Sequence, residues 1–263
     1  MKYKVIEKEN VTLYTDEPIM VRNKSTGLIG KLIMYIDQFA ESPRRWDNVA
    51  TIVSKGGNWD ISDEGWRMDA EEFTKFLHEK LDKKCPEIKG LRDIDHIVNC
   101  GNAKNYIVCK PIYMYDHSGQ TISLSPFGCR WDSGCCGYIF VFKDKILNDF
   151  ERATEDNWRD IADEIIQSEI DVYDNYIRGE VYGYCLKEGH PVEHKDLVTG
   201  VIWKSTEYEI ADSCCGFYGD CTLDILSAAL GDDWEVVEEI KEYEYETVLY
   251  WISYQLWRYH SPE

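Results

Sequence analysis

The stretch Tyr113–Phe142 carries side chains whose types and order resemble those of a catalytic site. Asp116, His117 and Ser118 follow one another and supply the carboxylate, imidazole and hydroxyl of a hydrolase triad. Consecutive strand residues point to opposite faces of a sheet, so a relay among these three is not expected. His117 can still act as an acid or base, with Asp116 or Asp132 as its partner. The commoner role is a structural histidine bonded to a neighbouring loop.

Arginines and tryptophans supply a second kind of chemistry, the binding of a phosphate-bearing ligand. Guanidinium groups hold phosphates, and indole rings stack on bases. The candidate residues for binding a ligand or partner are Arg44, Arg45, Trp46, Asp47, Asp116, His117, Arg130, Trp131 and Asp132. Two alternatives stay open. In one, the paired arginines satisfy nearby carboxylates; in the other, the Trp-Asp pairs build a core.

Four of the ten cysteines occur in two short segments that resemble each other, DSGCCGY and DSCCGFY, and Cys129 and Cys221 lie near them in sequence. If these segments were adjacent strands, they would bring together Cys129, Cys135, Cys136, Cys214, Cys215 and Cys221. Neither segment has the CxxC or Cys/His spacing of a zinc site, and reduced cysteines pack well as small apolar residues. Asp132, Asp212 and Asp220 lack the order of a calcium loop. Phosphate-cradling glycine motifs are absent as well. The sequence therefore predicts no metal and no cofactor.

The formal charge is −20, from 29 basic and 49 acidic residues. This charge argues against binding to a nucleic-acid backbone and favours a partner with a basic surface. Mimicry of DNA by the carboxylates is a sharper alternative. The 18 Tyr and 9 Trp residues suit protein interfaces, including those of a homo-oligomer. The start of the chain lacks a signal peptide, and no apolar run is long enough to span a membrane, so a cytoplasmic protein with no membrane partner is expected.

Two apolar runs flank the polar centre of the 113–142 stretch and predict paired strands with a connection that carries function. Further strands are expected at 3–6, 11–14, 28–36, 49–53, 181–186 and 201–210. The spacing predicts helices from a cap at Asp69 to Lys83, over 155–178 and from Thr222 to Leu230. We expect another helix to begin at Asp232 or Asp233, and a polar loop over 187–199.

Strands outnumber helices and do not alternate with them regularly, which predicts an α+β fold with a mainly antiparallel sheet and flanking helices. No linker or low-complexity segment divides the chain. We therefore expect a single domain over residues 1–263, with an N-terminal strand region (1–40) and an aromatic-rich C-terminal extension (222–263).

Four ordered blocks resemble a family of uncharacterised accessory proteins of bacteriophages and integrative elements of Firmicutes. The blocks are SPRRWDN (42–48), YDHSGQTISLSPFGCRWDSGCCGYIFV (115–141), EIDVYDNYIRGEVYGY (169–184) and DSCCGFYGD (212–220). The family pattern reads WDSGQVG where this chain has WDSGCCG, so the paired cysteines are not the shared feature. The first forty residues and the C-terminal tail lie outside the resemblance.

The resemblance implies an accessory protein that antagonises host defence. With the charge and the aromatic content, it favours a non-enzymatic phage protein that binds a host immune protein through an acidic, aromatic-rich surface in the host cytoplasm. One alternative is a sponge that sequesters a nucleotide immune signal with Arg44, Arg45, Arg130, Trp46 and Trp131. Another is a small hydrolase that uses His117.

Overall fold

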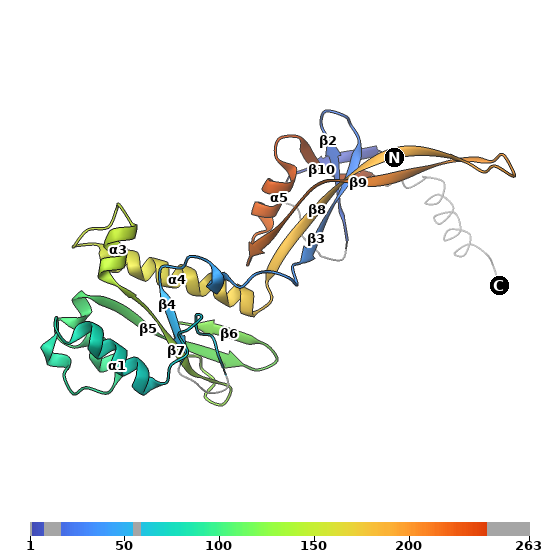
Figure 1. The fold of residues 1–263 in the computed structure, drawn as a ribbon. Coiled ribbons are helices and arrows are strands. Elements are labelled where there is room, and N and C mark those ends of the chain that lie inside the picture. Colours follow the sequence, from blue (N-terminus) through green and yellow to red (C-terminus); the bar gives the residue numbers. More distant parts are fainter. Residues whose placement is uncertain (1, 8–16, 55–58, 241–263) are drawn as a thin grey trace, which may run out of the picture. The chain divides into compact units, whose positions relative to one another are not determined.

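The computed structural model in Figure 1 describes residues 2–7, 17–54 and 59–240. Its fold is α+β, and the strand pairs whose register is defined are antiparallel, as the sequence predicts. The predicted strand at 11–14 and the aromatic tail at 243–259 lie outside the described residues. None of the helices in the described ranges has the length and apolar character needed to cross a membrane.

The chain divides into two compact units, although the sequence analysis expected one domain. Unit 1 comprises residues 1–35, 183–215 and 221–263, and unit 2 comprises residues 36–182 and 216–220. The division has no sequence signal because the chain changes unit within continuous strands, near residues 35, 182 and 215. A linker rich in glycine, proline or serine is therefore not needed.

Unit 1 is built on a six-stranded sheet in the order β1-β10-β2-β3-β8-β9. The strands are β1 (Lys2–Ile6), β2 (Ile19–Asn23), β3 (Ile29–Ile36), β8 (Val181–Lys195), β9 (Ile202–Tyr218) and β10 (Trp234–Ile240). Helix α5 (Thr222–Leu230) buries Ile225, Leu226 and Leu230. Strand β1 pairs with β10 from the other end of the chain.

Unit 2 is built on a four-stranded sheet in the order β4-β7-β5-β6. Its strands are β4 (Thr51–Ser54), β5 (Ile107–Asp116), β6 (Gln120–Ser123) and β7 (Ser133–Phe142). Its helices are α1 (Ala70–Leu81), α2 (Ile94–Asn99), α3 (Lys143–Asp149) and α4 (Trp158–Ile177), with 3₁₀ turns η2 (Pro43–Arg45), η3 (Pro86–Ile88) and η4 (Ala103–Asn105).

Helices cover both faces of the sheet in unit 2, which gives this unit two apolar cores (Figure 1). Helices α3 and α4 cover one face, whereas α1 and α2 cover the other. Strand β7 contributes to both cores, with Ile139 and Val141 on the α4 side and Tyr138 and Phe140 on the α1 side. This double burial explains why the sequence of β7 is a continuous apolar run and not an alternating one.

Two sequence expectations fail in unit 1, and both concern strands. The predicted loop at 187–199 forms the second half of β8. Strand β10 replaces the helix that was expected to begin at Asp232 or Asp233. Most of β9 and the distal half of β8 are solvent-exposed, so these segments lack the apolar alternation that marks a half-buried strand.

Candidate functional site

The central stretch of the sequence forms the middle of the sheet in unit 2. Strand β5 pairs with β6 on one side and with β7 on the other. A three-residue turn joins β5 to β6, and the Asp116 N–H donates to the Asp132 carbonyl at 2.8 Å. The structure therefore brings together three of the predicted residues, Asp116, His117 and Asp132.

Asp132 is the centre of this group, which we call the turn cluster (Asp116, His117, Cys129 and Asp132). The His117 Nδ1 atom lies 3.5 Å from Asp132 Oδ2, and the Cys129 thiol donates to the same oxygen at 3.4 Å. The His117 side chain is 63% exposed. Among the described residues, no hydrogen bond joins His117 to Cys129 or Ser118. The imidazole is therefore oriented toward a carboxylate and is not coupled to a nucleophile in this conformation.

Asp116 is held as a carboxylate by two donors. Trp59 Nε1 donates to its Oδ2 atom at 2.9 Å, and Gln120 Nε2 donates to the same atom at 3.1 Å. These bonds, first that of Trp59 and then that of Gln120, lower the pKa of Asp116 because they favour the charged form. A carboxylate with a lowered pKa is a weak general base near neutral pH. The sequence analysis did not identify Trp59, which is distant in sequence.

A shallow pocket of about 330 Å³ lies beside the turn cluster. The turn supplies His117 and Gln120, while the end of α4 supplies Ile177 and Arg178. Glu180 also lines the pocket, and its Oε1 atom lies 2.6 Å from Arg178. The guanidinium charge is thus already matched by a carboxylate, so this pocket offers little attraction for a phosphate.

Arg44 is an internal structural residue. Its side chain is only 5% exposed, and its guanidinium contacts Asp63 at 2.8 Å and Glu169 at 2.7 Å. It also donates to the Ala50 carbonyl at 2.8 Å. Burial alone would lower the pKa of Arg44, but the bonds to Asp63 and Glu169 raise it. Arg44 therefore satisfies nearby carboxylates, which is one of the two roles that the sequence left open.

The other predicted binding residues are exposed. Arg45 and Asp47 are exposed, and Trp46 packs edge-on against Tyr218 with ring centroids 5.2 Å apart. Arg130 is exposed too, and Trp131 is 96% exposed in the loop before β7. The sequence predicted that Arg44, Arg45 and Arg130 surround one phosphate. Because Arg44 is buried and bound by Asp63 and Glu169, it cannot contribute to such a site.

The two cysteine segments belong to different sheets. Cys135 and Cys136 lie on β7 in the four-stranded sheet, whereas Cys214 and Cys215 lie on β9 in the six-stranded sheet. The adjacent-strand arrangement on which the six-thiol metal site depended is therefore not formed. No group of metal-ligating side chains occurs within the described ranges. Burial raises the pKa of Cys136 to about 12, which makes this thiol unreactive.

Asp212 lies on β9 in unit 1, whereas Asp132 immediately precedes β7 in unit 2. The Tyr184 hydroxyl donates to Asp212 Oδ2 at 2.7 Å. Asp212 thereby ties β9 to β8 and has a structural role.

A surface that the sequence analysis did not identify lies at the distal end of β8 and β9. These two strands extend as a long ribbon beyond the other strands of their sheet (Figure 1). We call residues 190–207 the arm. Its tip exposes Leu197 and Val198, each 95% exposed, followed by Val201, Ile202 and Trp203 at about half exposure. A contiguous exposed apolar segment of this kind is typical of an interaction surface.

Local bonds order the tip of the arm. The Asp196 side chain accepts hydrogen bonds from the Val198 and Thr199 amides at 2.8 and 2.7 Å. Gly200, with φ of +72°, completes the turn in a conformation that suits glycine. Behind the tip, the His194 ring stacks on Trp203 with centroids 5.2 Å apart and bonds to Ser205 at 2.6 Å. The apolar side chains are thus presented on a defined turn.

No protein-family model, curated protein or solved structure matches this chain. The resemblance to the phage accessory family therefore remains a prediction.

Proposed function

We propose that this chain is a phage counter-defence protein that inhibits a host immune system by binding one of its proteins through the arm. The observation that supports binding is the exposed apolar tip, Leu197–Trp203, on a pre-ordered turn. Exposed leucine, valine, isoleucine and tryptophan side chains weaken solubility unless a partner buries them. The assignment of that partner to host immunity rests on the resemblance of the sequence blocks.

The ordered turn favours affinity as well as specificity. Binding orders flexible loops at a cost of about 0.5–1.5 kcal/mol for each immobilised side chain. The bonds of Asp196 to the Val198 and Thr199 amides already order the backbone of the tip in the free protein, so binding has to order only the side chains. Trp203 is the side chain on the arm with the largest apolar area to bury, and tryptophans are common at the energetic centres of interfaces.

The chemistry of the arm and of the whole chain defines the partner. Its contact site is an apolar groove that receives Leu197, Val198 and Trp203. A basic rim around that groove matches a chain of net charge −20 and speeds association. Strand β9 is an edge strand of its sheet and is exposed along most of its length. It can therefore also pair with a free strand of the partner.

The turn cluster supports the hydrolase alternative less well. Asp116 is bound by Trp59 and Gln120, and His117 faces a carboxylate that also holds the Cys129 thiol. No described residue couples His117 to a hydroxyl or thiol, which general-base activation of a nucleophile requires. The exposed Trp131 beside this cluster instead adds a second point of contact for a partner.

An infection assay tests the proposed function. Host strains that each carry one defence system are challenged with a phage that the system restricts, while they express the wild-type chain or a variant. We expect wild type to restore plaque formation in at least one strain. The double variant Leu197→Ser/Val198→Ser should lose most of this effect, because it removes the apolar tip and leaves the Asp196 turn in place.

The matched control is Leu223→Ser. Leu223 is 53% exposed on α5 in unit 1, outside the arm, so this variant should behave like wild type. Two results would contradict the proposal: failure of the wild-type chain to protect the phage in any strain, or full protection by the double arm variant.

A further inference from the structure

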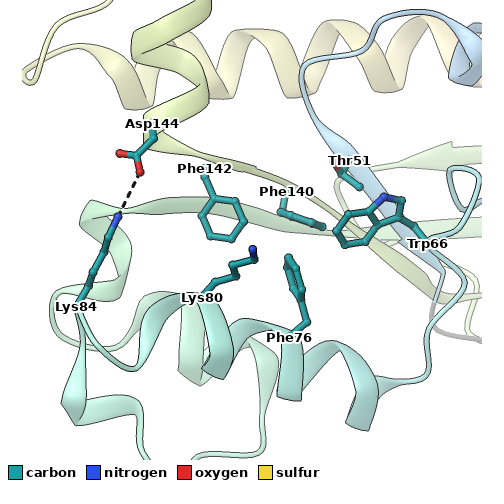
Figure 2. Close-up of a pocket in the computed structure, with 8 residues that line it drawn as sticks. All are labelled: Thr51, Trp66, Phe76, Lys80, Lys84, Phe140, Phe142 and Asp144. Atoms are coloured by element: carbon teal, nitrogen blue, oxygen red, sulfur yellow. Dashed lines mark hydrogen bonds and ion pairs between the residues drawn. The ribbon is translucent and has the colours of Figure 1, made fainter.

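An aromatic pocket opens on the α1 side of the sheet in unit 2, and it contains none of the site residues predicted from the sequence (Figure 2). Its volume is about 460 Å³, within the range of small-molecule sites. Strand β7 supplies the floor, α1 one wall, and the segment before α1 another. The lining residues are Thr51, Trp66, Phe76, Lys80, Lys84, Phe140, Phe142 and Asp144.

Four aromatic side chains form the apolar part of this pocket. The Trp66 ring meets Phe76 and Phe140 edge-on, at centroid distances of 5.2 and 5.4 Å. Phe142 continues the row at 5.7 Å from Phe140. Phe140 is buried, whereas Trp66, Phe76 and Phe142 are only partly buried, so they leave ring faces and edges open to a ligand. Open aromatic walls favour a flat, unsaturated ligand over a branched aliphatic one.

Two lysines give the pocket a positive end. Lys80 extends across the opening, with its Nζ atom 5.7 Å from the centre of the Phe76 ring (Figure 2). Within the described part of the chain, Lys80 makes no ion pair. Lys84 lies 3.2 Å from Asp144, in an exposed pair whose two partners can separate at little cost. The two ammonium groups outnumber the one carboxylate of the pocket, Asp144, so the pocket has a net positive charge that favours an anion over a cation.

The opposite end of the pocket carries polar groups. Figure 2 places the Thr51 side chain next to the indole of Trp66, away from Lys84 and Asp144. Neither the Thr51 hydroxyl nor the Trp66 indole N–H has a hydrogen-bond partner among the described residues. One hydroxyl and one N–H donor can therefore bond to the edge of a ring seated among the aromatic residues.

We infer that this pocket binds a mononucleotide-like ligand, a planar heteroaromatic ring that carries phosphate. The ring lies among Trp66, Phe76, Phe140 and Phe142, its polar edge faces Thr51, and the phosphate contacts Lys80 and Lys84. Base–aromatic stacking tolerates every base because each has a π-face. The lysines provide the charge contacts that the arginines predicted from the sequence do not, because Arg44 is occupied internally.

Ligand-observed NMR with the purified full-length protein tests this inference. The probes are AMP, GMP, CMP and UMP, with adenosine as the probe that lacks phosphate and decanoate as the aliphatic anion. We expect saturation transfer from the protein to the base protons of at least one mononucleotide. Adenosine and decanoate should bind at least about tenfold more weakly, because each lacks one of the two recognised features.

Variants then locate the site. Lys80→Gln/Lys84→Gln should weaken mononucleotide binding about tenfold or more and reduce its salt dependence. Lys75→Gln is the control, since Lys75 is also an exposed lysine on α1 but pairs with Glu71 outside the pocket. Phe142→Leu should weaken binding while leaving the thermal unfolding curve close to that of wild type.

Three outcomes would overturn the inference: no binding of any mononucleotide, equal binding by Lys80→Gln/Lys84→Gln and wild type, or tighter binding of decanoate than of all four nucleotides. The arm lies in unit 1 and the pocket in unit 2. The Leu197→Ser/Val198→Ser variant should therefore still bind the mononucleotide, so the two proposals can fail separately.

Discussion

Arg44 joins three segments of unit 2 through bonds that are almost completely shielded from water. It links η2 to Asp63 after β4 and to Glu169 on α4. Glu169 also accepts from the Val49 and Ala50 amides, and Asp63 accepts from the Ile52 amide. Removal of Arg44 leaves two carboxylates without their cation, so the whole junction depends on this one side chain.

Arg44→Met should therefore lower the free energy of unfolding by about 3–5 kcal/mol, the usual cost of breaking a buried ion pair from one side. Urea denaturation followed by circular dichroism measures the change. The neighbouring residue supplies the control: Arg45 is exposed and makes no ion pair among the described residues, so Arg45→Met should change stability by about 0.5 kcal/mol or less. Similar losses for the two variants would contradict the assignment of Arg44.

At this scale, the sequence reveals residue types but not their partners. The sequence left two roles open for Arg44 and Arg45, the binding of a phosphate-bearing ligand and the satisfaction of nearby carboxylates. The partners that decide between them, Asp63 and Glu169, lie 19 and 125 residues away. Trp59 was missed for the same reason, because 57 residues separate it from Asp116. A single sequence does not show which residues that are distant in the chain come into contact in the fold.

Helix α1 shows how well a local pattern can predict an element. Phe73, Leu77 and Leu81 recur at helical spacing and are all buried, and Asp69 caps the helix together with Glu72 in a reciprocal pair. Helix α4 was predicted on similar grounds and ends before Gly179, whose φ is +74°. By contrast, β8 and β9 are long because they pair with each other. Their distal residues are largely exposed, so the sequence there has no apolar periodicity that predicts a strand.

The last turn of α1 contains a histidine that makes stability depend on pH. His78 Nδ1 lies 2.8 Å from Asp82 Oδ1, and Nε2 lies 2.8 Å from the Leu91 carbonyl. The bond to Asp82 is the largest cause of the raised pKa of His78; burial opposes it, and the bond to the Leu91 carbonyl adds to the rise. A raised pKa in the folded state means that protonation stabilises the fold.

The stabilisation by His78 is complete below its unfolded pKa of about 6.5 and disappears as the pH rises through the folded value. We therefore expect the stability advantage of wild type over His78→Gln to be largest near about pH 5.5 and to shrink toward about pH 8.5. Urea midpoints measured across this range for both proteins provide the test. An advantage that is constant, or that grows with pH, would contradict the assignment.

On the scale of the whole molecule, the order of the predicted strands and helices indicated the fold class, but it did not indicate that the chain forms two compact units. The antiparallel sheets and flanking helices follow from short apolar runs separated by turns, and they are confirmed. Strands β3, β8 and β9 include residues of both units. The boundaries between the units therefore lie within strands, where no glycine-, proline- or serine-rich linker is present to reveal them in the sequence. The arm was missed because residues 187–199, which include Leu197 and Val198 of its tip, were predicted to be a polar loop and not half of a strand pair.

The proposed binding function rests on the charge of the chain and on the arm. In that proposal, the charge steers the chain toward a basic surface and the arm supplies the apolar side chains that the partner buries. The mononucleotide site proposed at the aromatic pocket of unit 2 is a separate proposal. The central claim is that the arm contacts a protein of the host immune system.

The most direct measurement of this claim is a capture experiment from host lysate, with native mass spectrometry on the eluted complex. Wild type, Leu197→Ser/Val198→Ser and Leu223→Ser are compared at equal concentration. We predict that wild type and Leu223→Ser retain the same immune protein in a fixed stoichiometry, that the double arm variant retains little of it, and that the purified partner rebinds. Equal capture by all three proteins, or capture of no immune protein by wild type, would contradict the account.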